Sequence, residues 1–231
     1  MGLLGTLPCY NIPTIVQTKR DIYKEIFTED DTPGLDAINK REKEIYGDQE
    51  PIHLATVVPY DLGGGDPLWA INYYISEKQQ RHFHYVTLGF TYLFYDEDLA
   101  EDETNGFGFE LTFRHLPVKE DPEKPLWAAN LLTNISKYVF SSGIGFDDYN
   151  YMSANGPLRL DSKTEITAII FFKDPEMQEI DTPHGLVKFL QIFGITTQEY
   201  NDLRNEKYTA KELLTSHMVT NPLLITDLTR K

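Results

Sequence analysis

Alternation between apolar and polar residues predicts a sheet, and the pattern is clearest at residues 107–113. This segment (FGFELTF) has phenylalanine or leucine at every second position, with glycine, glutamate and threonine between them. Successive side chains of a strand point to opposite faces, so one face of this strand is a row of large apolar groups. We expect that face to lie on the main core.

Other segments have the composition of strands. Residues 166–172 (ITAIIFF) are nearly all apolar, as in a central strand that is buried on both faces. Residues 186–193 predict a further strand, although Lys188 and Gln191 lie three positions apart and leave a helix open. The remaining predicted strands span residues 53–60, 68–75, 83–90 and 223–228.

Helical spacing of apolar residues predicts the helices. The longest is expected at residues 126–140, begins after Pro125, and carries Trp127, Leu131 and Ile135 on one side. Shorter helices are expected at residues 19–27, at 35–46 with Gly47 as the C-cap, and after capping boxes at Thr196–Glu199 and Thr209–Glu212.

These elements predict the fold class and the domain organisation. Because strands and helices do not alternate strictly, we expect an α+β domain with a mixed, mainly antiparallel sheet flanked by helices. We place this domain at residues 34–231. Residues 1–33 are expected to form an N-terminal appendage, punctuated by Pro8 and Pro13 and closed by an acidic break at residues 29–33.

The net charge of the chain restricts the classes of partner that it is expected to bind. Its 231 residues include 21 lysines and arginines against 36 aspartates and glutamates, a formal net charge of −15. A protein that tracks nucleic-acid phosphates needs clustered basic residues, so this charge argues against nucleic acid and equally against an anionic membrane. A basic protein partner remains compatible, because an acidic surface steers cationic ligands.

The first residues and the single cysteine bear on localisation. Gly2 and Thr6 match a myristoylation pattern, but no second membrane signal follows them. No apolar run reaches the ~18 residues that a membrane span requires. Cys9 cannot form an internal disulfide, which indicates a reducing compartment. We therefore expect a soluble, cytoplasmic protein.

Patterns for catalysis are missing from the sequence. It has no G-x-S-x-G nucleophile motif, and Gly63–Gly65 lack the lysine of a phosphate-binding loop. His82 and His84 share one face of a predicted strand, but no third ligand follows at a suitable spacing. We interpret them as half-exposed residues of an edge strand, and keep a metal-dependent hydrolase that uses both as an alternative. No cofactor is expected, and the acidic run at residues 96–103 is expected to be a solvated loop.

Aromatic residues gather after the longest helix. Residues 141–152 (SSGIGFDDYNYM) contain Phe146, Tyr149 and Tyr151 beside two glycines. Tyrosine is favoured at protein interfaces, and loops held by a rigid scaffold often carry function. The segment is therefore a candidate recognition patch, although its rings could equally fold back onto the core. The same alternatives hold for Tyr138, which lies on the apolar side of its helix.

Several segments resemble the suppressor of fused family, in the same order along the chain. The most specific of them is residues 106–114 (GFGFELTFR). The others are GGDPL (64–68), HYVTLG (84–89), YVF (138–140), DPEM (174–177), TPHG (182–185), FLQI (189–192) and LITD (224–227). The resemblance runs from about Gly34 to the last residue.

The resemblance implies a binding protein rather than an enzyme. The animal member of the family is a two-lobed negative regulator of Hedgehog signalling, which clamps a peptide of a zinc-finger transcription factor between its lobes as an added β-strand. This chain resembles the N-terminal lobe alone, and single-domain relatives in bacteria are thought to include immunity proteins against polymorphic toxins. Tyr138 stands where a tyrosine contacts the peptide, and Asn150 where an aspartate pairs with a peptide histidine.

We therefore expect a non-enzymatic module that binds a protein partner through a sheet edge and the surface from Tyr138 to Met152, and that sequesters or inhibits this partner. A bacterial immunity protein against a basic toxin would suit the charge of −15. A monomer or weak homodimer is expected, and a structural homo-oligomeric subunit stays open as a further alternative. The candidate contact residues are Tyr138, Phe146, Tyr149, Asn150 and Tyr151.

Overall fold

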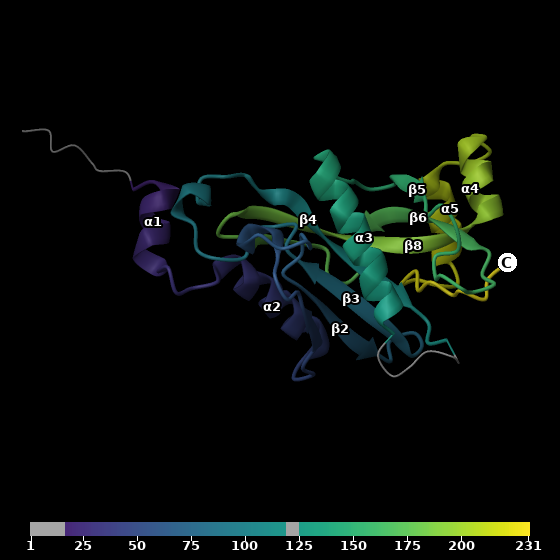
Figure 1. Cartoon of the computed structure of the whole chain (residues 1–231), viewed down its shortest axis with the longest axis horizontal. Helices are drawn as coiled ribbons and strands as arrows, with labels where there is room; N and C mark the ends of the chain where they lie inside the picture. Colours follow the sequence, from purple (N-terminus) through teal and green to yellow (C-terminus); the bar gives the residue numbers. More distant parts are fainter. Residues whose placement is uncertain (1–16, 119–124) are drawn as a thin grey trace, which may run out of the picture.

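The computed structural model describes residues 17–118 and 125–231, and its strands form one sheet. Within these residues the sheet has eight strands in the order β1-β2-β3-β4-β8-β6-β5, with β7 also paired to β8 (Figure 1). β4 and β8 run parallel, whereas the other neighbouring pairs are antiparallel. The strands are β1 (Ile52–Ala55), β2 (Ala70–Ser76), β3 (His82–Leu88), β4 (Thr104–His115), β5 (Tyr151–Ser153), β6 (Ile166–Lys173), β7 (Glu179–Thr182) and β8 (Gly185–Thr196).

Helices flank the sheet, and the predicted α+β class with a mixed, mainly antiparallel sheet is confirmed. Each helix expected from the sequence is present, and capping boxes begin α4 at Thr196 and α5 at Thr209, as predicted. The helices of the described residues are α1 (Lys19–Ile26), α2 (Pro33–Tyr46), α3 (Leu126–Ser142), α4 (Thr197–Arg204) and α5 (Ala210–Met218), with short 3-10 turns η1 (Tyr60–Leu62) and η2 (Glu97–Leu99).

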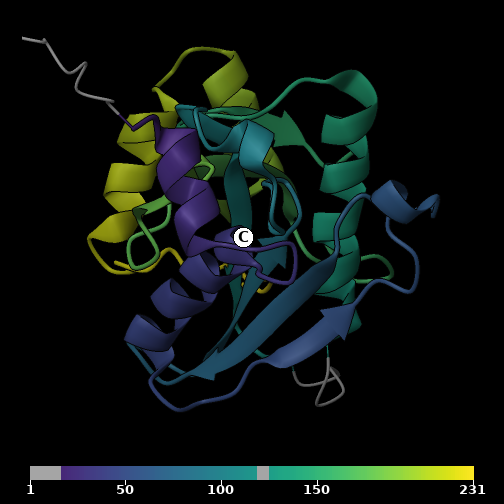
Figure 2. The same cartoon turned by 90° about the vertical axis from the view of Figure 1, so that its left-hand side faces the viewer.

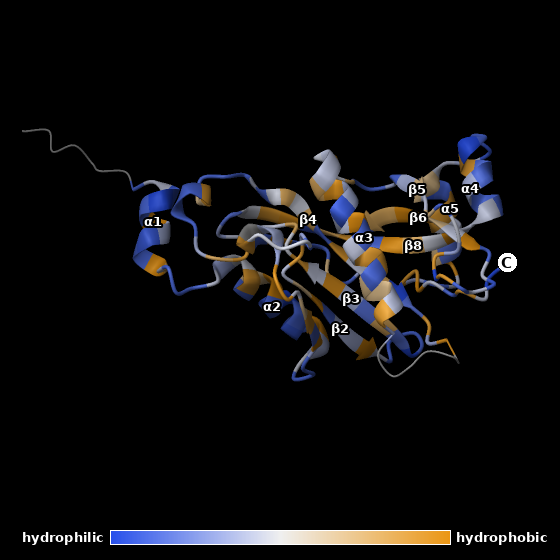
Figure 3. Cartoon of the chain, viewed as in Figure 1, coloured by the Kyte–Doolittle hydropathy of each residue, from blue (hydrophilic) through white to orange (hydrophobic). Residues whose placement is uncertain are grey.

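The helices cover opposite faces of the sheet. α3 lies on one face, whereas α2, α4 and α5 lie on the other, so the sheet is the middle of three layers (Figure 2). Alternate residues of β8 show this division, because Leu190 and Ile192 join the core beneath α3 while Phe189 and Phe193 point to the other side. Figure 3 shows the result as hydrophobic strands in the centre and largely hydrophilic surfaces on α1 and α4.

β4 confirms the expected strand at residues 107–113 and extends it at both ends. Phe109, Leu111 and Phe113 are buried beneath α3. Glu110 is also fully buried, on the opposite face, because β4 lies in the middle of the sheet with helices on both sides. Four hydrogen bonds to Glu110 from hydroxyl and backbone donors of residues 87–91 compensate for its burial.

A buried polar cluster of Arg114, Asp174, Gln191 and His84 lies on the face of α2, between the apolar groups under α2 and those under α4 and α5. Arg114 Nη1 lies 2.5 Å from Asp174 Oδ2 and also donates to Gln191. His84 Nε2 lies 3.2 Å from the same carboxylate oxygen. Burial alone would raise the pKa of Asp174, but Arg114 and His84 hold it well below its usual range. Asp174 and Gln191 thus partner one end of the Arg114 guanidinium, whereas Arg114 Nε has no hydrogen-bond partner among the described residues.

The expected half-exposure of His82 and His84 is wrong. Both side chains are fully buried, because β3 lies between β2 and β4 and is not an edge strand. His84 Nδ1 is hydrogen-bonded to the hydroxyl of Tyr46 from α2, and His82 Nδ1–H donates to Gln80 O at 2.8 Å. Burial is the main reason that the pKa of His84 falls to about 4.

The lengths of some strands also differ from the predictions. The strand expected at residues 53–60 ends at Ala55, and the chain then turns before Pro59, which has no backbone N–H to offer a sheet. β5 and β7 were not predicted. Each has only three or four residues, which is too few to show alternation.

The prediction of a strand at residues 223–228 is wrong. Thr226 forms only an isolated bridge to His115 at the end of β4. Leu224 has a φ of +46°, which takes the chain out of the extended conformation. Leu224, Ile225 and Leu228 of this segment are buried without forming a strand.

α1 packs against the loop between β3 and β4 and against the β7–β8 hairpin. Tyr23 is buried there, and its hydroxyl lies 2.8 Å from His184 Nε2. Arg20 forms an ion pair of 2.5 Å with Glu97 of η2. The acidic segment at residues 96–103 therefore takes part in holding α1.

The domain boundary at residue 34 stays a prediction. The myristoylation pattern of Gly2 and Thr6, together with Cys9, lies outside the described residues.

Candidate functional site

β5 is the last strand at one end of the sheet, and among the described residues no strand covers its outer edge. It pairs with β6, and Ala154 N–H donates to Thr167 O at 2.8 Å just beyond its end. Hydrogen bonds of an antiparallel strand point alternately toward and away from its neighbour. The backbone groups of Tyr151 and Ser153 therefore point away from β6, where an added strand could bond to them.

Two of the predicted contact residues flank this edge on the face of α3. Tyr138 lies near the end of α3 with 43% of its surface exposed. Its ring stacks on Phe146 with 6.0 Å between the ring centres, and Phe146 stacks on Phe171 of β6 at 3.9 Å. Tyr138 is thus a surface residue, and the half-buried Phe146 connects it to the core.

Tyr149 and Tyr151 flank the same edge on the opposite face, where α4 and α5 lie. The ring of Tyr151 meets Tyr200 of α4 edge-on at 6.0 Å, and Lys211 Nζ of α5 lies 5.9 Å from the centre of the Tyr149 ring. Both tyrosines remain exposed. The aromatic residues therefore line both sides of β5. We call Tyr138, Phe146, Tyr149 and Tyr151 the aromatic edge.

A tight turn at residues 147–150 positions the rings of the aromatic edge. Asn150 N–H donates to Asp147 O, and Asn150 Oδ1 accepts from Asp147 N–H, both at 3.1 Å. Tyr149 has a φ of +67°, in the left-handed region that costs a bulky residue about 1 kcal/mol or more. The fifth predicted contact residue, Asn150, thus uses its side-chain oxygen to hold the turn.

The turn also fixes the charges of this region. Asp147 accepts a hydrogen bond of 2.9 Å from Asp148 N–H and lies 3.2 Å from Lys188 Nζ. The backbone donor first, and then Lys188, lower the pKa of Asp147. Asp147 is therefore a permanent negative charge beside the aromatic edge at neutral pH.

A groove of about 530 Å³ lies between α3 and β5. Leu131, Ile135 and Tyr138 of α3 form one wall, and Met152 of β5 and Leu160 of the following loop form another. Leu160 is 80% exposed. The groove can therefore take an apolar side chain of a ligand that lies along β5.

Sequence reasoning missed the groove and Leu160. The groove brings α3 together with residues 152–160, which are separated from it along the chain. Nothing in the local pattern around Leu160 shows that it lies beside Tyr138. The only signal was an isolated leucine in a polar segment at residues 159–165.

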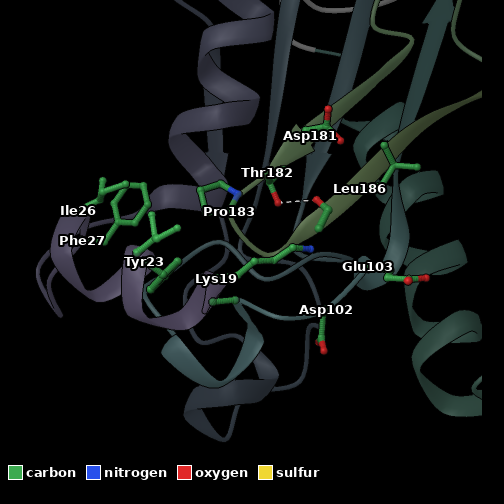
Figure 4. A pocket seen from close by; sticks show the side chains of 13 residues that line it. Lys19, Tyr23, Ile26, Phe27, Asp102, Glu103, Asp181, Thr182, Pro183 and Leu186 are labelled. Carbon is green, nitrogen blue, oxygen red and sulfur yellow. Dashed lines mark hydrogen bonds between the residues drawn. The ribbon is translucent and has the colours of Figure 1, made fainter. Parts of the chain in front are cut away.

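A larger hollow of about 620 Å³ lies between α1 and the β7–β8 hairpin (Figure 4). Tyr23 and Ile26 of α1 and the next residue, Phe27, face Pro183 of the hairpin, where Thr182 Oγ1 donates to Gly185 O at 2.7 Å. None of the predicted contact residues lies there. The structure does not show what would cover this hollow.

The described residues hold neither a metal-binding group of side chains nor a membrane-spanning helix. None of their histidines, cysteines, aspartates and glutamates form a group of three or more that could hold a metal ion. None of their helices is both long and apolar enough to cross a bilayer. The candidate site is the outer edge of β5, lined with aromatic side chains on both sides.

The fold and this edge define a class, an α+β domain whose sheet ends in a strand without a neighbour among the described residues. The chain belongs to the suppressor of fused family, because the model of the family "Suppressor of fused protein (SUFU)" matches residues 64–231. The resemblance seen in the sequence motifs is therefore confirmed.

Curated relatives and solved structures agree with this assignment. The Suppressor of fused homologs of Homo sapiens and Mus musculus are each 35% identical over 209 residues, which is 85% of this chain and 43% of theirs. The chain thus spans less than half the length of these relatives. Among solved structures, a chain from "the Sufu-Fu complex crystal structure" has a TM-score of 0.78 and 30% identity over 87% of this chain and 92% of its own.

Two further solved structures share the fold. Drosophila Suppressor of Fused has a TM-score of 0.76 and 29% identity, over 88% of this chain and 52% of its own. A putative homolog from Neisseria gonorrhoeae has a TM-score of 0.57 over 86% of this chain and 95% of its own. Its identity is only 12%, so it shows a similar fold and nothing more.

Proposed function

We propose that this chain is a non-enzymatic module that binds a protein partner by strand addition at β5, and that it sequesters or inhibits this partner. The observation that carries the proposal is the free edge of β5, with exposed aromatic rings on both of its sides. Backbone hydrogen bonds along such an edge provide affinity, and pockets for alternate side chains provide specificity.

The geometry of an added strand matches the aromatic edge. Side chains of a strand point alternately to the two faces of a sheet. One set of partner side chains would lie against Tyr138 and the groove beneath it, and the other against Tyr149 and Tyr151. Large aromatic anchors near the centre of an interface carry much of the binding energy. The unfavourable φ of Tyr149 fits a residue that is kept for binding.

Membership of the family supports a protein as the partner. A chain that this protein resembles at 30% identity belongs to a structure titled as a complex of Sufu and Fu. The curated relatives are more than twice as long as this chain. We propose that this α+β domain binds its partner through β5.

For the biological role, we propose a bacterial immunity protein that neutralises a basic toxin in the cytoplasm, as a monomer or weak homodimer. The support is the net charge of −15, because complementary charge accelerates association with a basic partner. A complex with an acidic partner that is insensitive to salt would contradict this role but would leave strand addition untouched.

The test starts from the tagged chain in its source cells. A captured protein is identified and purified, and its affinity is measured by calorimetry for the wild type and for the double variant Tyr138→Ala/Tyr149→Ala. We expect at least a tenfold loss, because anchor residues of an interface often contribute 2 kcal/mol or more. The matched control is Tyr92→Ala, an exposed tyrosine on the loop after β3, far from β5. An equal affinity of the double variant and the wild type would overturn the proposed surface.

A backbone variant tests strand addition itself. Ser153→Pro removes an N–H that points away from β6, so the pairing of β5 with β6 is retained while one bond to an added strand is lost. We expect weaker binding with an unchanged far-ultraviolet circular dichroism spectrum. Unchanged affinity would mean that the partner binds the aromatic side chains without pairing to β5.

No structural observation favours the alternatives. His82 and His84 are buried, and both ring nitrogens of His84 face Tyr46 and Asp174, so a hydrolase that uses them is not proposed. Light scattering at two concentrations would distinguish a homo-oligomeric subunit from the proposed monomer or weak homodimer.

A further inference from the structure

A cavity of about 520 Å³ lies between α2, the turn after it, and strands β1 and β2. It is at the β1 end of the sheet, whereas the aromatic edge is at the β5 end. Its inner end is formed by Glu42, Asn72, Tyr74 and Leu88, all of which are buried. Its outer end is open, so a ligand can enter from solvent.

Glu42 gives this cavity a buried carboxyl oxygen without a hydrogen-bond partner. The side chain is only 2% exposed, and its Oε2 accepts hydrogen bonds from Asn72 Nδ2 at 2.9 Å and from Tyr74 OH at 3.0 Å. Its Oε1 is buried and has no hydrogen-bond partner among the described residues. Leaving a buried charged oxygen unpaired is costly, and native structures rarely do so without a reason.

His53 provides a second acceptor in the same cavity. Its Nδ1 lies 2.7 Å from Asn72 Oδ1. Asn72 uses its amide nitrogen to donate to Glu42, so its oxygen must accept from His53 and the proton is on Nδ1. In the neutral ring, Nε2 then carries a lone pair and can accept a hydrogen bond. Glu42 and His53 both line this cavity.

We propose that this cavity binds a small organic cation, an ammonium or guanidinium group on an aliphatic stem, with Glu42 as its ion-pair partner. The group donates to Glu42 Oε1 and to His53 Nε2, and its stem packs against Leu35 and Leu88. A hydrogen-bonded ion pair of this kind satisfies the oxygen that the protein leaves without a partner.

The surrounding charges and chemistry favour such a ligand. The rim of the cavity carries Asp48 and Glu50 against the single cation Lys43, and the chain as a whole has a charge of −15. These charges raise the local concentration of cations. A metal ion is disfavoured, because the described residues hold no group of three or more metal-ligating side chains. The cavity also has an apolar wall, which an aliphatic stem can cover and a metal ion cannot.

The experiment titrates the full-length, ¹⁵N-labelled protein with n-butylguanidinium chloride and, separately, with n-butylammonium chloride, and follows the side-chain amide of Asn72 by NMR. n-Butanol and potassium chloride are the controls for the stem and for ionic strength. We expect saturable shifts with at least one of the two cations and none with the controls. The cation that saturates at the lower concentration identifies the preferred head group, guanidinium or ammonium.

Variants locate the binding group. In Glu42→Gln, the side-chain oxygen still accepts from Asn72 and Tyr74, but the negative charge is lost, and we expect affinity to fall by about tenfold or more. The matched control is Glu50→Gln at the exposed rim, with a fall of about threefold at most. His53→Ala removes the second acceptor together with the hydrogen bond to Asn72, so its stability is measured alongside, and binding is expected to weaken by about threefold or more.

Two results would overturn the proposal. One is the absence of saturable shifts with either cation, which means that water alone satisfies Glu42. The other is equal binding by the wild type and by both Glu42→Gln and His53→Ala. Neither result bears on partner binding at β5, because the two sites lie at opposite ends of the sheet.

Discussion

The centre of the sheet and its β5 edge use polar and aromatic groups in opposite ways. In the centre, Arg114, Asp174 and His84 are fully buried, and each interacts with another member of the buried polar cluster. At the edge, Tyr138 and Tyr149 are exposed, and their rings make few contacts.

This difference predicts which substitutions change the stability of the protein and which change its binding to a partner. A group whose partners are all internal contributes to the free energy of unfolding, and removing it leaves a buried charge without compensation. A group with few internal partners contributes little to stability and is available for recognition. Glu42 lies between these extremes, because it is buried but only one of its oxygens has partners. The predictions below test this ordering, starting from the centre.

The largest effect is expected for Asp174→Asn in the buried polar cluster. The change removes the charge that faces the fully buried Arg114, and we expect the free energy of unfolding to fall by about 3–5 kcal/mol. Urea denaturation measures it. Asp147→Asn, at an exposed carboxylate paired with Lys188, is the control and should cost less than about 1 kcal/mol. Similar losses for the two variants would show that the cluster does not stabilise the centre.

The second prediction concerns pH and Glu42. Burial raises the pKa of Glu42 from its ordinary value of 4.5 to about 7. Below pH 4.5 the carboxyl is protonated in both folded and unfolded chains, so no difference arises. Between pH 4.5 and 7 the unfolded chain loses this proton first, so the stability of the wild type falls as pH rises. Above pH 7 the loss is complete.

Glu42→Gln removes this titration. The stability of this variant relative to the wild type should therefore rise between pH 4.5 and 7, by up to about 3 kcal/mol. Thermal unfolding of both proteins across this range measures it. Burial also raises the pKa of Glu110 to about 7. Its charge contributes to the raised pKa of Glu42, so its titration cancels only in part in the comparison. A difference that stays flat with pH would show that Glu42 is ionised throughout.

The third prediction separates stability from binding at the edge. Tyr149→Gly places the residue that best tolerates a positive φ at a position with φ of +67°. We expect the free energy of unfolding to stay level or to rise by up to about 1 kcal/mol, while partner affinity falls. Calorimetry of unfolding and of binding on the same protein measures both. Loss of stability together with affinity would mean that the Tyr149 ring supports the fold.

The smallest change in stability is expected for Tyr138→Ala. Because the ring is exposed and stacks only on Phe146 among the aromatic rings of the described residues, the cost should remain below about 1 kcal/mol. Leu132→Ala, six residues earlier on the buried side of α3, is the contrast and should cost about 2–5 kcal/mol. Comparable costs would place Tyr138 in the core and remove it from the proposed interface.

The sequence predicted the elements whose signals are local. The alternating segment at residues 107–113 became β4, the apolar segment at 166–172 became β6, and the capping boxes began α4 and α5 as expected. It failed where the outcome depended on neighbours. His82 and His84 looked like edge residues because alternation does not show how many strands lie beside a given strand.

The candidate site divides in the same way. The family motifs, the acidic charge and the cluster of aromatic residues after α3 can be identified from the sequence alone, because they are properties of composition and residue order. Only the tertiary structure decided that Tyr138 is exposed, that β5 is an edge, and that Asn150 holds a turn. It alone brought Leu160 beside α3 and left Glu42 Oε1 without a partner. Exposure, strand order and cavities arise from contacts between segments far apart in the chain, and no local pattern of residues encodes them.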